Sequence, residues 1–284
     1  MSLPGDHVVR AMLDDGSFRI IAARTTSTVA GIVGAQHATG TTATHLGSLV
    51  TGAILFREMM APGYRVQAIL RGKDAKGTLV ADSNPSGAAR ALVQLDPDGA
   101  GIELGRGAHL QMMRSLPNGD INQGVVELAA SGDLSDAMMA YMKSSEQVTS
   151  VVRVTARLDN GGVIAAGGYM VQLLPEAGRE SIDAMTAHLD QLGDVEQQIE
   201  PGFTGEGLIE RIAGTEPFTW LGASEVRYEC WCSDVRVMSA LATLDRHDIE
   251  ELIAAGEPVE LNCDYCNTTY RIPTTRLRGL LQDS

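Results

Sequence analysis

Four cysteines constrain this chain more than any other feature of its sequence. They are the only cysteines among 284 residues, and they form two tight pairs, a C-x-C at 230–232 and a C-x-x-C at 263–266. Four thiolates in two pairs make a tetrahedral set of soft ligands, which suits zinc, and the C-x-x-C spacing is that of a metal knuckle. The sequence therefore predicts one Zn²⁺ per chain with four ligands: Cys230, Cys232, Cys263 and Cys266.

The rest of the sequence gives no sign of catalysis. It has no phosphate-binding G-x-x-x-x-G-K-[ST] loop, no H-E-x-x-H and no G-x-S-x-G elbow, which are the motifs of nucleotide hydrolases, metalloproteases and serine hydrolases. A catalytic zinc usually keeps three protein ligands and one open position, whereas four thiolates close the site. We therefore expect no enzyme and no catalytic residues.

The charge of the chain is negative and unevenly distributed. The net charge is −14, and two basic against eleven acidic residues give the segment 176–226 a net charge of −9. Negative charge repels phosphate backbones, so we expect no nucleic-acid partner. The longest apolar run, near 46–56, is shorter than the roughly 20 residues that span a bilayer. Charged residues near the N-terminus interrupt any secretory signal, so we expect a cytoplasmic protein without a membrane partner.

Hydrophobic periodicity predicts an α+β fold for residues 1–175, with a large antiparallel sheet. Asp159-Asn160-Gly161-Gly162 is a good hairpin turn between the last two strands. Helices are expected over 41–60 and 131–145. Strands are expected over 17–24, 64–70, 78–81, 88–95, 109–114, 125–128, 148–158 and 163–174.

Two further parts are predicted after this core domain. The acidic segment 176–226 is expected to be a helical linker, with helices near 182–192 and over 205–213 that glycines and prolines interrupt. Residues 227–284 are expected to form a small zinc-binding domain. Its predicted elements are strands over 226–230, 259–262 and 269–272 and helices over 235–242 and 248–254. A domain of about 58 residues buries little surface, so it should be folded with zinc and loose without it.

The same cysteines suit a redox switch. Thiolates are the groups that peroxide and hypochlorous acid oxidise, and each pair is local enough to bridge within itself. A Cys230–Cys232 bridge closes a very tight ring, and strained disulfides are the readily reduced, regulatory kind. Loss of the metal would loosen the small domain and the acidic linker beside it, so oxidation would expose apolar surface.

The cysteine motifs resemble those of the bacterial redox-regulated chaperone family, the thirty-three-kilodalton heat-shock holdase. The matching stretches are Cys230-Trp231-Cys232-Ser233, Cys263-Asp264-Tyr265-Cys266-Asn267 with Tyr270, and Ala166-Gly167-Gly168-Tyr169-Met170-Val171-Gln172. The resemblance implies an ATP-independent holdase that is inactive when reduced and zinc-bound. It implies that the oxidised form has two disulfides, Cys230–Cys232 and Cys263–Cys266, releases zinc, unfolds its linker and binds unfolding client proteins, often as a homodimer.

Two other functions are weighed against this one. A structural zinc-ribbon module for protein interaction or nucleic-acid binding would have a basic, aromatic-rich zinc domain, but residues 227–284 have a net charge of −4. A thiol oxidoreductase using Cys263 and Cys266 would need a thioredoxin-like βαβ context, which the sequence does not show.

Overall fold

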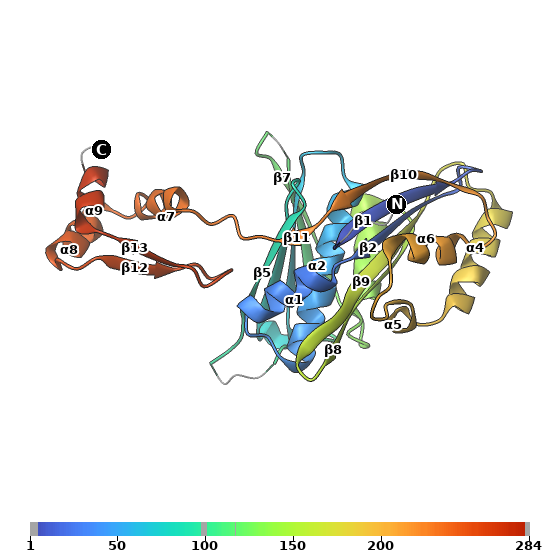
Figure 1. Cartoon of the computed structure of the whole chain (residues 1–284), viewed down its shortest axis with the longest axis horizontal. Coiled ribbons are helices and arrows are strands. Elements are labelled where there is room, and N and C mark those ends of the chain that lie inside the picture. Colours follow the sequence, from blue (N-terminus) through green and yellow to red (C-terminus); the bar gives the residue numbers. More distant parts are fainter. Residues whose placement is uncertain (1–4, 98–100, 117, 282–284) are drawn as a thin grey trace. The chain divides into compact units, whose positions relative to one another are not determined.

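In the computed structural model, a long helix, α2 (Gly40–Met59), lies at the centre of the larger part of the chain (Figure 1). Its side chains are buried on every side of the helix, including Leu46, Leu49, Ile54 and Phe56, each at most 1% exposed. A helix that is apolar all round must be covered all round, and two β-sheets enclose α2 from opposite sides. The predicted helix over 41–60 matches it closely.

The structure describes residues 5–97, 101–116 and 118–281 and divides into two compact units, Met1–Glu229 and Cys230–Ser284. The first unit contains both the predicted core domain, 1–175, and the predicted linker, 176–226. The division into three parts at 175 and 226 stays a prediction. Among the described residues, no helix combines the length and the apolar character needed to cross a membrane.

The first sheet has five strands, all antiparallel, in the order β10-β1-β2-β9-β8. The β8–β9 turn has Asn160 at φ 48° and Gly161 at φ 81°, which is the left-handed geometry that tight hairpins require. This confirms the predicted hairpin. The strands are β1 (His7–Leu13), β2 (Phe18–Arg24), β8 (Ser150–Asp159), β9 (Gly162–Leu173) and β10 (Phe218–Glu225).

The second sheet has six strands in the order β11-β5-β4-β3-β6-β7, with only the short β11 running parallel to its neighbour in the described sheet. The sequence predicted one large antiparallel sheet, whereas the described part of the first unit has two sheets, and α2 is packed between them. The strands are β3 (Arg65–Arg71), β4 (Thr78–Ser83), β5 (Ala88–Gln94), β6 (His109–Ser115), β7 (Ile121–Glu127) and β11 (Arg227–Tyr228). The α+β prediction is confirmed.

Shorter helices complete the core of the first unit. The predicted helix over 131–145 is an α-helix, α3, which continues directly into a π-helical turn. Helix α1 was not predicted, and Asp6 caps it from outside by accepting a hydrogen bond from the Thr28 N–H at 2.5 Å. These helical elements are α1 (Thr26–Ala35), a 3₁₀ turn (Lys73–Ala75), α3 (Leu134–Tyr141) and the π-turn (Met142–Glu146).

Alternate residues of the five-stranded sheet face two different cores. Val8 and Ile21 point inward to α2, whereas Val9 and Ile20 point outward, as the period of two in a strand requires. The outward face is covered by α4 (Arg179–Leu192), α5 (Val195–Gln198) and α6 (Gly205–Ala213). The predicted linker is therefore packed on the sheet through its own hydrophobic core.

Close approach of the linker depends on one glycine of β9. A Cβ atom on Gly167 would lie 2.4 Å from the ring of Phe203, so only glycine leaves room for that ring. Helix α6 is also joined to β1 by a 3.1 Å contact between Glu206 Oε2 and Nε2 of the fully buried His7. The linker is not purely helical, because its last part is β10, which pairs with β1 along the whole of that strand.

The second unit is small and has a correspondingly small core. Four described side chains are buried there: Leu241, Ile249, Ile272 and Leu277. Asp245 caps one helix by accepting from the Asp248 N–H at 3.0 Å. The elements are α7 (Asp234–Leu241), α8 (Arg246–Ala254), β12 (Val259–Asn262), β13 (Thr269–Ile272) and α9 (Thr274–Leu280). The two strands coincide with their predicted ranges, and α9 was not predicted.

Candidate metal centre

The first cysteine pair lies in irregular backbone. The strand predicted over 226–230 is shorter in the structure, since β11 ends at Tyr228, and both Cys230 and Cys232 follow it. The chain then turns into α7, whose N-terminus is capped by Ser233. The Ser233 hydroxyl accepts a hydrogen bond from the Arg236 N–H at 3.3 Å, and serine is a preferred residue at this position. The cap fixes where the helix begins, directly after Cys232.

The second pair lies in the tight turn between β12 and β13. The carbonyl oxygen of Cys263 accepts hydrogen bonds from the N–H groups of Cys266, at 3.2 Å, and Asn267, at 2.7 Å. Asn267 has a φ of 56°, a left-handed conformation that asparagine tolerates better than most residues. The turn is closed by the Cys263 N–H, which donates to the carbonyl of Thr268 at 2.9 Å.

These two segments bring all four sulfur atoms together. The four Sγ atoms lie within 4.8 Å of one another, with 3.7 Å between Cys230 and Cys263 and 3.4 Å between Cys232 and Cys266. Tetrahedral Zn–S bonds of about 2.3 Å place neighbouring sulfurs roughly 3.8 Å apart. The cluster thus has the donor type, number and spacing of a structural metal site. All four predicted residues belong to it.

Two hydroxyl groups complete the surroundings of the sulfurs. The Tyr270 hydroxyl donates to Sγ of Cys232 at 3.1 Å, and the Thr268 hydroxyl lies 3.2 Å from Sγ of Cys266. Partners of this kind orient metal ligands and stabilise their charge. The sequence drew attention to Tyr270 without giving it a role, and Thr268 was missed. Thr268 could have been found from its position in the sequence, two residues after the ligand Cys266 and inside the knuckle turn.

The metal-free thiols differ in acidity. Burial raises the pKa of Cys232 to about 12, although the Tyr270 hydroxyl opposes this, and burial also raises the pKa of Cys263. Burial acts in the same direction on Cys266, but hydrogen bonds from Thr268 and the neighbouring thiols outweigh it and lower its pKa to about 7. Packing thiols together disfavours ionising all of them at once, so a cation is what allows four thiolates to coexist here.

Comparison with known proteins identifies the family. The family model described as "Hsp33 protein" matches residues 6–273. The chain belongs to the Hsp33 family. The 33 kDa chaperonin of Bacillus subtilis is 31% identical over 97% of this chain and 98% of its own length. That of Desulforamulus reducens is 29% identical over 98% of this chain and 97% of its own length.

A solved structure agrees with this assignment at the level of the fold. The crystal structure of the 33 kDa chaperonin of Thermotoga maritima, an Hsp33 homologue, matches with a TM-score of 0.83 and 23% identity, and the match covers 99% of both chains. The Hsp33 fold therefore extends over both units. The predicted chaperone family and function are confirmed, and Hsp33 is a family of chaperones rather than of enzymes.

Proposed function

We propose that this Hsp33 chain is an ATP-independent holdase that one Zn²⁺ keeps inactive and that oxidation activates. The observation that carries the proposal is the cluster of four Sγ atoms within 4.8 Å of one another, in a unit whose described core has only four buried side chains. When bound, Zn²⁺ supplies a closed, four-thiolate cross-link between the two cysteine segments. The unit then depends for its stability on groups that an oxidant attacks.

The cysteines perform the redox step. One thiolate of a pair attacks peroxide, the O–O bond breaks, and a sulfenic acid and hydroxide form. The second cysteine of the pair attacks that sulfur, and the displaced hydroxyl leaves as water. Each pair thereby loses two electrons to one peroxide, and we assign the products as Cys230–Cys232 and Cys263–Cys266. A disulfide sulfur is no longer a thiolate ligand, so the metal is released.

The segment 176–226 carries the change to the larger unit. It ends four residues before Cys230 in the chain, and its net charge of −9 opposes its own compaction. Its helices cover the outward face of the five-stranded sheet, where Val9, Ala11, Ile20, Ala22 and Val171 are at most 3% exposed. Unfolding of the segment uncovers this apolar face, and an apolar patch of this kind binds exposed hydrophobic segments of client proteins.

The proposed function also determines the binding partners of the protein and its cellular compartment. The partners are unfolding client proteins, and the oxidised form is a homodimer; nucleic acid and membrane are not partners. The protein acts in the cytoplasm, where reducing conditions keep thiols reduced until oxidant accumulates. Binding clients needs no bond to be made or broken in them, so the chain has no catalytic residues.

An aggregation assay tests the function. A client that unfolds on heating is mixed with reduced, zinc-loaded protein or with peroxide-treated protein, and light scattering is followed. We expect suppression only by the treated protein, with loss of four thiols and release of one zinc per chain. Equal suppression in the two states would remove the switch from the proposal. Tight, salt-sensitive binding of nucleic acid by the reduced protein would favour a zinc-ribbon module instead.

A further inference from the structure

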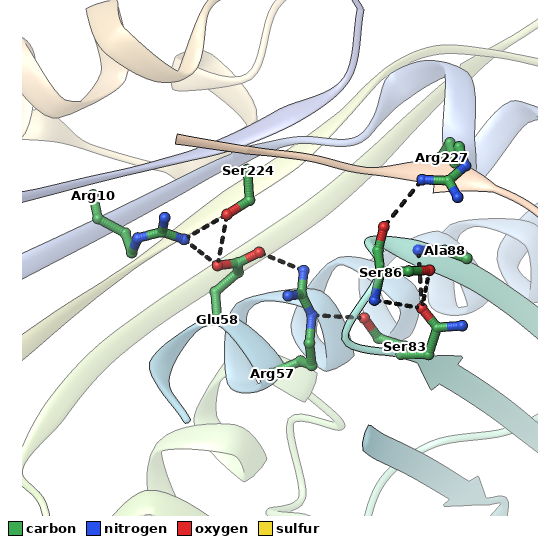
Figure 2. A network of polar contacts seen from close by, with 9 residues as sticks. Arg10, Arg57, Glu58, Ser83, Ser86, Ala88, Ser224 and Arg227 are labelled. Atoms are coloured by element: carbon green, nitrogen blue, oxygen red, sulfur yellow. Dashed lines mark hydrogen bonds and ion pairs between the residues drawn. The ribbon is translucent and has the colours of Figure 1, made fainter. Parts of the chain in front are cut away.

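A second polar site lies in the first unit, at the end of α2 between the two sheets. It is a pocket of about 440 Å³ lined by five segments: β1, β2, the end of α2 with the loop that follows it, the turn between β4 and β5, and β10. Three arginines line it: Arg10 of β1, Arg19 of β2 and Arg57 of α2. Part of this site is seen in Figure 2, where Glu58 lies between Arg10 and Arg57.

The positive charge of this pocket exceeds its negative charge. Of the described residues that line it, Glu58 carries the only carboxylate, and it bridges Arg10 and Arg57. The Glu58 side chain is 4% exposed and that of Arg57 is 9% exposed. Arg19 instead donates to neutral acceptors, the amide oxygen of Gln172 at 2.7 Å and the Met59 carbonyl at 3.4 Å. The lining residues therefore hold a surplus of two positive charges.

The backbone around the pocket neutralises only a part of this surplus of positive charge. The carboxyl end of α2 lies here, and a helix C-terminus is equivalent to about half a negative charge. Burial, together with the nearby Arg10 guanidinium, lowers the pKa of Arg19. Burial also lowers the pKa of Arg57, although Glu58 opposes it and Arg10 adds to it. More than one positive charge remains without a matching negative charge inside a half-enclosed pocket.

We propose that this pocket binds the phosphoryl group of a small phosphorylated anion. Guanidinium groups present parallel N–H donors that match two oxygens of a phosphate, and such charge-assisted hydrogen bonds are the strong ones. A volume of about 440 Å³ is in the range of pockets that take small molecules rather than single ions. Tyr64, Pro85 and Leu221 add non-charged walls to the same pocket, and these suit an organic group attached to the phosphate.

The position of the pocket links its occupancy to the linker, a step that rests on the proposed function. Ser224 of β10 accepts from Arg10 at 2.9 Å and donates to Glu58 at 3.3 Å, and Leu221 of β10 is a lining residue. The site is complete only while β10 is paired with β1. An anion that binds the docked form alone favours it about 100-fold when present at 100 times its Kd. The bound anion would therefore oppose activation.

Titration of the full-length, reduced, zinc-loaded protein tests the binding. Inorganic phosphate and glycerol phosphate are the probes, in calorimetry at constant ionic strength with chloride as the compensating salt. We expect saturable binding of one anion per chain. Tighter binding of glycerol phosphate would identify a phosphate monoester as the ligand, and equal or tighter binding of inorganic phosphate would identify the free ion.

Variants of one strand make the test specific. Arg19→Gln removes one charge from the pocket without leaving Glu58 unpaired, and we expect it to weaken binding about tenfold or more. Arg24→Gln removes the same charge from the same strand outside the pocket and should leave the Kd unchanged. Arg19→Lys keeps the positive charge but loses the parallel N–H donors of the guanidinium group. Its Kd should therefore lie between that of the parent and that of Arg19→Gln. Zinc content and thermal unfolding show whether each variant is folded.

The outcomes separate the anion site from the holdase. Uptake that does not saturate, or equal Kd values for Arg19→Gln and Arg24→Gln, would overturn the site whatever the chaperone assay shows. Phosphate at 100 times the parent Kd should slow activation by peroxide up to about 100-fold in Arg24→Gln and only about tenfold or less in Arg19→Gln. If phosphate binds but does not slow activation, the proposed coupling between the pocket and the linker would be wrong, while the anion site itself would stand.

Discussion

The structure reveals a contact between Tyr270 and the cysteine cluster that the sequence did not predict. It lies on β13, four residues after Cys266, and its hydroxyl donates to Sγ of Cys232 at 3.1 Å. A hydrogen bond to a thiolate stabilises the charged form and lowers its reactivity as a nucleophile. We therefore expect Tyr270 to support metal binding and to restrain oxidation through the same contact.

Replacement of Tyr270 with phenylalanine tests this role. Tyr270→Phe keeps the ring and removes the hydroxyl, so we expect zinc affinity to fall about 10–100-fold, as for other partners of metal ligands. A chromophoric chelator in competition measures the affinity. Tyr64→Phe, a matched change in the other unit, should have no effect. An unchanged affinity in Tyr270→Phe would show that the hydroxyl does not support the ligand.

A ligand change should have a larger effect. Cys263→Ser removes one of four thiolates and replaces it with a hydroxyl, which is a poor ligand for zinc at neutral pH. We expect a loss of affinity greater than the roughly 100-fold of a supporting residue, and a second unit that is easily cleaved by protease. Zinc release and limited proteolysis measure the two effects. Parent-like affinity would contradict the assignment of Cys263 as a ligand.

At the scale of elements, the sequence predicted best those helices and strands whose formation depends on residues close together in the chain. Helix α6 and strands β12 and β13 coincide with their predicted ranges because their periodicity and turn residues lie within a few positions. Strand β10 was missed since most of its residues are exposed, so it lacks the alternation of a half-buried strand. It forms because β1 supplies its hydrogen-bond partners, 205 residues away at Leu13 and Phe218.

Two other missed elements have similar causes. Strand β1 is buried on both of its faces, and such a run does not alternate between apolar and polar residues. Helix α1 is rich in threonine, valine and glycine, which are weak helix formers, and its stability comes from packing. Likewise, the sequence identified the four cysteines, whereas the arginine pocket joins residues from five separate segments and has no sequence motif.

The buried face of α6 offers a test of the linker. Leu208→Ala removes a fully buried side chain between α6 and the five-stranded sheet, and it should weaken docking by roughly 2–5 kcal/mol. We expect this variant to suppress client aggregation in part without oxidant. Leu110→Ala, an equally buried leucine of β6, should lower the melting temperature without this activity. Equal activity of both variants under reducing conditions would show general destabilisation and no specific role for α6.

At the scale of the whole molecule, stability is distributed unequally between the two units. The first has two large hydrophobic cores, one on each face of the five-stranded sheet. The second has one small core and a metal site. Small domains bury too little surface to be stable alone, so the metal should determine directly the folding of the second unit, whereas the first unit has large cores of its own.

Removal of the metal under reducing conditions tests this inequality. A strong chelator with a reductant should unfold residues 230–281, because the free energy of metal binding is also folding free energy for such a unit. The core of the first unit around α2 should stay folded. NMR spectra of the labelled protein before and after chelation report on both units separately. A second unit that stays folded without metal would disprove its dependence on zinc.

The pairing of β10 with β1 has a consequence for how a client is held. β10 is the edge strand of its sheet, so its departure would make β1 the new edge and leave main-chain groups of His7–Leu13 without partners. An open edge accepts any extended peptide through main-chain hydrogen bonds, whatever its side chains are. Hydrogen exchange should then be faster at β1 in the oxidised protein and slow again with client bound. Such backbone pairing would let one site serve many unrelated sequences.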